Sequence, residues 1–175
     1  MRFLPLFRRA VAPEEYARLA GEALASVLPM ADLLRRRGIA LGSVEQGRAH
    51  AIELETVSEH LDALSIVERS LAGVRPPDGA AALHAVLRAV LESYRATLRE
   101  YRAVCAAVRD ADVEAYRAHN QRGRELDAHA CESLQSLVTA ADSSGGIPVP
   151  ELLRRMAARA EAYRRVAGGA FAFWE

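Results

Sequence analysis

The feature that most restricts the fold is a row of mostly apolar side chains that recurs every three or four residues between residues 84 and 108. This is the heptad spacing that puts side chains on one stripe of an α-helix, whereas a β-strand would show a spacing of two. The row consists of His84, Leu87, Leu91, Tyr94, Leu98, Tyr101, Cys105 and Val108. Such a stripe is buried only when other helices pack against it, so the chain is expected to be helical well beyond this segment.

Two helices are expected before this segment. The first starts at Pro13, which suits the first turn of a helix, and ends before Gly38. Pro29 lies inside it and is expected to kink or split it. The second starts with a capping box at Ser43 and stops at Gly73.

The third helix is predicted to start near Asp78 and to end at a tight break, where Asp112 is the expected N-cap of a fourth helix. The fourth helix carries its own row at the same spacing, formed by Val113, Tyr116, Asn120, Gly123, Asp127, Ala130, Leu134 and Leu137. Because short turns join these segments, successive helices should run antiparallel.

The sequence therefore predicts an all-α fold, an antiparallel up-down four-helix bundle with an additional shorter C-terminal helix. Aromatic residues are only 6% of the chain, which argues against a β-sandwich. We expect an N-terminal arm (1–12), the four-helix bundle (13–141), a loop (142–149), a C-terminal helix (150–167) and an aromatic tail (168–175).

The charge balance argues against nucleic acid as a partner. The chain has 23 basic and 23 acidic residues and a formal net charge of zero, and every basic residue is Arg. A neutral domain has no general electrostatic attraction to DNA or RNA. The absence of Lys also excludes a Schiff-base lysine and a P-loop lysine. GC-rich coding and escape from lysine-directed modification are both open explanations.

No apolar stretch approaches the length of a membrane span, and the first residues do not form the apolar core of a signal peptide. The two cysteines cannot make a disulfide framework. We therefore predict no membrane span and a cytoplasmic location in a bacterial type of protein.

Motifs for chemistry are absent from the sequence. No Glu-x-x-His, His-x-x-x-His, Cys-x-x-Cys or Gly-x-Ser-x-Gly occurs, which argues against di-iron, zinc and common nucleophilic sites. His50 with Glu53 and His129 with Glu132 show the reverse order of the di-iron pair. We predict that the protein is not an enzyme and has no metal or other cofactor.

If the third helix folds back onto the fourth at residues 110–111, polar side chains of the two rows lie at the same height along the helix pair. Tyr101 falls level with Asn120, Tyr94 with Asp127, and His50 of the second helix near Tyr101. One interpretation is a hydrogen-bonded network that fixes the helix register. The alternative is a ligand pocket formed by these five residues.

A second polar level is expected to bring Glu68 and His84 together as a buried pair. The same register separates Cys105 from Cys131 by several turns of helix, too far for a disulfide. Both cysteines are predicted to be small buried hydrophobic residues.

Large aromatic side chains gather at the two ends of the chain, where all four Phe and the only Trp are found. Phe171, Phe173 and Trp174 are candidate anchors, either between two subunits or as a docking peptide for another protein. A tail that packs on its own helices is the third possibility.

The predicted function is protein–protein contact without catalysis, as a homodimer or as an accessory subunit. The alternative is a bundle that binds a small ligand or a metal ion through the buried polar layer of His50, Tyr101 and Asn120.

Overall fold

The computed structural model describes residues 9–37, 47–144, 149–151, 153–155 and 157–158, and for 30–53 it describes the backbone of the helices only. The elements are β1 (Arg9–Ala10), α1 (Pro13–Arg37), α2 (Gly47–Ala72), β2 (Val74–Arg75), α3 (Ala81–Arg109) and α4 (Val113–Ser144). The predicted all-α class is confirmed. Within these ranges no helix is both long enough and apolar enough to cross a membrane.

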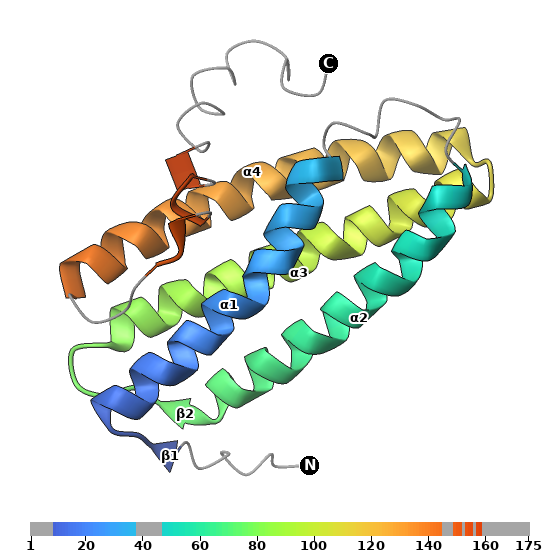
Figure 1. The fold of residues 1–175 in the computed structure, drawn as a ribbon. Helices are drawn as coiled ribbons and strands as arrows, with labels where there is room; N and C mark the ends of the chain where they lie inside the picture. The colour runs from blue at the N-terminus through green and yellow to red at the C-terminus, as the bar shows by residue number, and fades with distance from the viewer. Residues whose placement is uncertain (1–8, 38–46, 145–148, 152, 156, 159–175) are drawn as a thin grey trace, which may run out of the picture.

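Helix α3 is the element on which the other helices pack. It contacts α4 most extensively and also contacts α2 and α1. Figure 1 shows α3 between α2 and α4, with α1 crossing the layer that they form. The side chains of α3 therefore meet neighbours from all three other helices.

The row predicted from heptad spacing is the buried stripe of α3. His84, Leu87, Leu91, Tyr94, Leu98, Tyr101 and Cys105 are buried, and only Val108 at the end of the row is half-buried. Cys105 and Cys131 are both free and fully buried, as predicted. Burying a Leu side chain contributes roughly 1.5–3 kcal/mol, so this stripe is a main source of stability.

The break between α3 and α4 also follows the prediction. The Asp112 carboxylate accepts a hydrogen bond of 2.9 Å from the backbone N–H of Ala115, which makes Asp112 the N-cap of α4. Ala111 has a φ of 56°, in the left-handed region that a residue with a Cβ rarely adopts. The chain turns sharply here at the expense of strain at one alanine.

Helix α3 starts later than predicted. It begins at Ala81, and its N-cap is Ala80, which makes no side-chain capping bond. Gly79 between Asp78 and Ala80 has a φ of 85°, a conformation that suits glycine, so Asp78 belongs to the turn before the helix.

The first half of α4 is less buried than its row predicts. Val113 is 56% exposed, Tyr116 and Asn120 are half-buried, and full burial starts only near Asp127. The segment 118–125 is rich in polar side chains, whose burial without partners is unfavourable. This half of α4 therefore stays near the surface.

Helix α1 runs without a break through Pro29, so of the two predicted outcomes, a kink or a split, the split does not occur. Helix α4 continues to Ser144, three residues into the segment predicted as a loop. The predicted capping box at Ser43 lies outside the described residues.

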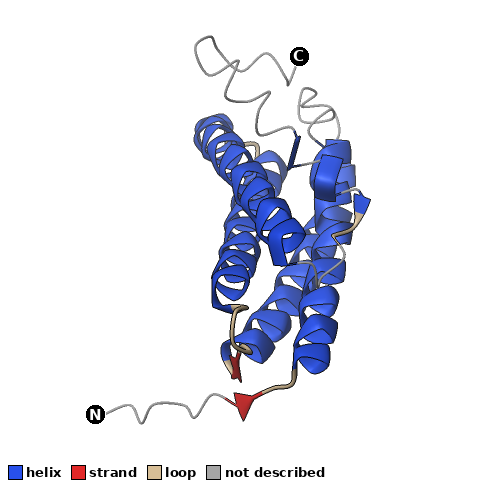
Figure 2. Ribbon diagram, turned by 90° about the vertical axis from the view of Figure 1, so that its left-hand side faces the viewer, coloured by secondary structure: helices blue, strands red, loops and turns tan. Residues whose placement is uncertain are grey.

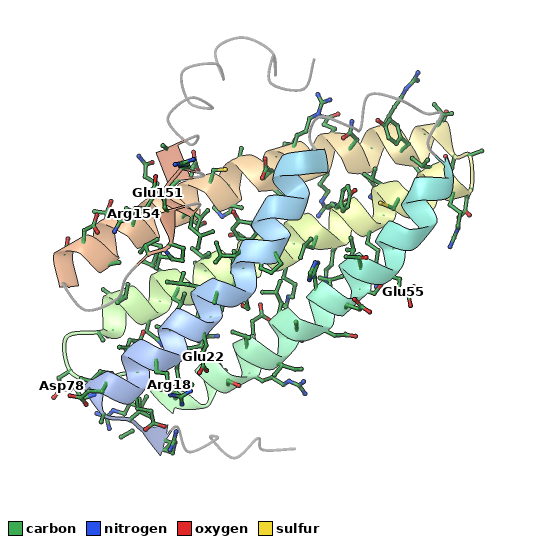
Figure 3. All side chains as sticks on the ribbon, viewed as in Figure 1. Arg18, Glu22, Glu55, Asp78, Glu151 and Arg154 are labelled. Carbon is green, nitrogen blue, oxygen red and sulfur yellow. The ribbon has the colours of Figure 1, made fainter. Side chains whose placement is uncertain are left out.

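The described part of the predicted C-terminal helix is helical at residues 151, 153–155 and 157–158. Leu153 joins the core with 0% exposure, and Arg154 pairs with Asp142 of α4 through two bonds of 2.7 and 3.0 Å. Figure 3 shows Arg154 and Glu151 beside α4. The remainder of the predicted helix lies beyond the described residues.

A two-residue parallel strand pair was not predicted. Arg9 pairs with Val74 and Ala10 with Arg75, and Figure 2 shows the pair at one end of the helices. Arg75 precedes Pro76, which favours an extended backbone at this position. The pair attaches residues 9–10, which belong to the predicted N-terminal arm, to the connection between α2 and α3.

The strain at Ala111 gives a stability prediction. Ala111→Gly should raise the free energy of unfolding by about 0.5–1 kcal/mol, because glycine adopts a positive φ readily. The matched control, Ala118→Gly in the exposed interior of α4, should lower it by a similar amount. Urea unfolding followed by circular dichroism measures both, and a destabilised Ala111→Gly variant would contradict the strained turn.

Candidate functional site

The candidate site is an open groove of about 690 Å³ between the last turns of α2 and the first half of α3, here named the α2/α3 groove. It has an apolar lining of Ala72, Pro76, Ala81, Ala85 and Ala89. The remaining lining residues are Glu68, Arg69, His84, Arg88, Glu92 and Arg95. His84 is the buried member of this set, so the groove is mainly an exposed surface.

The spacing of residues on α3 builds this groove. Ala81, Ala85 and Ala89 are four apart and form one row along the helix, all three exposed. Arg88 and Glu92 lie on the neighbouring row, also exposed and also four apart. Alanine side chains leave room above the helix backbone, which allows another helix to approach closely.

One ion pair crosses the groove. Arg95 of α3 donates to Glu68 of α2 at 2.5 Å, and their side chains are 30% and 19% exposed. Arg69 donates to the backbone oxygen of Ser65 at 3.1 Å. The Glu68–Arg95 pair thus ties α2 to α3 within the groove.

Arg88 and Glu92 differ from this pair. Neither makes an ion pair with the other or with any residue that the structure describes. Opposite charges four residues apart on a helix can form a weak pair of roughly 0.2–0.5 kcal/mol. Both charges lie on the surface without an ion-pair partner among the described residues.

At the buried side of the groove, His84 contacts Tyr16 of α1. The two rings are 5.8 Å apart between centroids and tilted by 45°. The Tyr16 hydroxyl is buried and has no hydrogen-bond partner among the described residues. Burial raises the pKa of Tyr16 from its ordinary value of 10.0 to about 12, because the charged phenolate is poorly solvated there.

The predicted pair of Glu68 and His84 is placed in this groove, since both residues line it. The ion-pair partner that the structure gives Glu68 is Arg95. A direct Glu68–His84 interaction stays a prediction.

The side chains of four of the five residues in the predicted ligand layer are described. Tyr94, Tyr101 and Asp127 are buried, with exposures of 0%, 4% and 5%, and Asn120 is half-buried. The His50 side chain lies outside the description. A ligand pocket at this layer stays a prediction.

Contacts between α3 and α4 include one cluster that sequence reasoning missed. His119 Nδ1 lies 2.8 Å from one carboxylate oxygen of Glu100, and Arg122 Nε lies 3.4 Å from the other. Glu100 and His119 are the sequence neighbours of Tyr101 and Asn120, whose common level along the helix pair stays a prediction. The antiparallel alignment of α3 and α4 about residues 110–111 could have predicted this cluster, because it sets Glu100 opposite positive side chains.

Two further predictions concern metal ligands and the aromatic tail. Within the described ranges, no group of three or more His, Cys, Asp or Glu residues is placed to hold a metal ion. Phe171, Phe173 and Trp174 lie beyond the described residues.

Comparison with known proteins gives no guide to function. No family model, no curated protein and no solved structure matches the chain. Any functional assignment therefore has to come from the residues themselves.

The buried Tyr16 hydroxyl gives a prediction. Tyr16→Phe should raise the free energy of unfolding by about 1 kcal/mol at pH 7, because it removes a buried polar atom without a partner. Tyr94→Phe is the comparison variant, since Tyr94 is also buried but does have an interaction partner, and it should be destabilised.

Tyr16→Phe also tests the raised pKa of the Tyr16 hydroxyl. The folded state holds the Tyr16 proton up to about pH 12, whereas the unfolded chain releases it near 10.0, so this tyrosine lowers stability as the pH rises between these values. Urea unfolding at about pH 9, 10 and 11 should show a smaller alkaline loss for Tyr16→Phe than for the unmodified protein. An identical alkaline loss in the two proteins would contradict the assignment.

Proposed function

We propose that this protein is a non-enzymatic helical protein that acts through protein–protein contacts, and that it does so first by self-association into a homodimer. The scaffold of this proposal is an antiparallel up-down four-helix bundle with an additional shorter C-terminal helix. Its location is proposed to be cytoplasmic. The contact surface is the α2/α3 groove.

The observation that carries the proposal is the exposed row of alanines beside charges that the described chain leaves unpaired. Ala81, Ala85 and Ala89 offer close approach to a helix, and Arg88 and Glu92 offer one charge of each sign. Surfaces that bind proteins combine a region of close packing with polar groups that find partners across the contact.

A second copy of the chain is the occupant that best fits the charge pattern. The groove presents both signs of charge on one helix row, so two identical surfaces can complement each other. The chain also has a formal net charge of zero, so two copies experience no net repulsion as they approach.

The aromatic residues Phe171, Phe173 and Trp174 offer a separate route to association, as an anchor between subunits or for another protein. This route rests on the sequence alone. Removing residues 170–175 distinguishes it from association through the groove.

Ligand binding by the buried polar layer is the second candidate function. It rests on the burial of Tyr94, Tyr101 and Asp127, three polar side chains that α3 and α4 place in the interior. Native mass spectrometry of the purified protein tests this candidate. Extra mass that disappears on denaturation and is lost in a Tyr101→Phe variant supports it.

The groove gives a direct test of self-association. The unmodified protein should have a mass twice the 19.0 kDa of one chain in sedimentation equilibrium. Ala85→Trp should weaken the dimer about 10- to 100-fold, because overpacking a close contact costs about 1–3 kcal/mol. Ala82→Trp, on α3 but outside the groove lining, is the matched control and should leave the dimer intact.

A monomer at every concentration would contradict self-association. A dimer that Ala85→Trp and Ala82→Trp leave equally stable would keep self-association but remove the groove from it.

A further inference from the structure

The geometry of Arg88 and Glu92 defines how two copies can meet. The two side chains lie one helical turn apart on the same exposed row of α3, and no described residue forms an ion pair with either. Glu68 and Arg95, by contrast, pair with each other across the groove, and Arg69 of α2 lines the groove without an ion pair among the described residues. On α3, the groove charges without an ion pair among the described residues are Arg88 and Glu92, which lie on one short stretch of the helix.

A twofold axis that is perpendicular to α3 and passes outside its exposed face, at the level of Val90, brings both charges to opposite charges at once. In a twofold contact, if residue i of one copy meets residue j of the second, then j also meets i. Antiparallel helices related by this axis bring Arg88 of each copy against Glu92 of the other. Two identical ion pairs form, one on each side of the axis.

The alanine row allows the helices to come close enough for these pairs. Ala89 lies next to the axis, where it meets the same residue of the second copy, and Ala85 lies one turn further out. Helix axes approach to about 8 Å when the side chains at the contact are small. Longer side chains at Ala85 or Ala89 would keep the charges apart.

We propose that the partner in the α2/α3 groove is a second copy of this chain, packed through an antiparallel α3–α3 contact with reciprocal Arg88–Glu92 ion pairs. This inference rests on the proposed self-association and assigns its surface, symmetry and charge pairs. The contact is specific to identical copies because each charge needs the opposite charge one turn along the partner helix.

Charge reversal tests the reciprocal pairing. Arg88→Glu sets two carboxylates against each other at both pairs of the dimer, and Glu92→Arg sets two guanidinium groups together at both. Each single variant should therefore dissociate at least about tenfold more readily than the unmodified protein. The double variant Arg88→Glu/Glu92→Arg restores both opposite-charge pairs and should dimerise again.

Mixing the two single variants gives the sharpest result. One copy then carries two carboxylates at these positions and the other two guanidinium groups, so both pairs across the axis are attractive only between unlike copies. Native mass spectrometry of the equimolar mixture should show a heterodimer, while each variant alone is mainly the monomer. Arg102→Glu, an exposed charge reversal on α3 outside the groove, is the control and should dimerise normally.

The outcomes separate this inference from the proposed function. If the unmodified protein, both single variants and Arg102→Glu all dimerise alike, self-association stands and the Arg88–Glu92 contact is wrong. If removal of residues 170–175 abolishes the dimer and charge reversal does not, the contact lies in the tail instead. If the unmodified protein is a monomer at all concentrations, both proposals fail. Circular dichroism of each variant shows that loss of the dimer is not loss of the fold.

Discussion

Burial of one stripe of α3 against three other helices is the interaction on which this structure depends. Leu87, Leu91, Tyr94 and Leu98 are almost completely excluded from solvent, and the helix contacts α1, α2 and α4. Because one stripe of α3 is used for the core, the alanines and charges between residues 81 and 95 are left facing outward. One helix thus organises the interior and carries the candidate contact surface.

Much of this fold could be predicted, because its signals are local. Heptad spacing marked the stripe of α3, and an aspartate after a helix break marked the N-cap at Asp112. The pairing of β1 with β2 could not be predicted, because it joins segments distant in sequence through only two residues each. The spacing of the α4 row did not fix how deeply its first half is buried, and the polar residues 118–125 lie near the surface.

The site was harder to predict, because long side chains choose partners in three dimensions. Register placed Glu68 near His84, and both do line the groove, yet the ion-pair partner of Glu68 is Arg95, which reaches across from a different turn of α3. The alanine row is visible in the sequence at a spacing of four. Its significance emerges only when the fold shows that these alanines are exposed and lie beside Arg88 and Glu92.

The central claim, that two copies meet through α3 on a twofold axis, is tested most directly by cross-linking at the axis. Ala89→Cys places a thiol next to its symmetry mate, within the distance that a disulfide can span. Mild oxidation should give a covalent dimer of twice 19.0 kDa on a non-reducing gel, because the native Cys105 and Cys131 are buried. A variant that stays monomeric, or cross-links no faster than Ala118→Cys on α4, would contradict the claim.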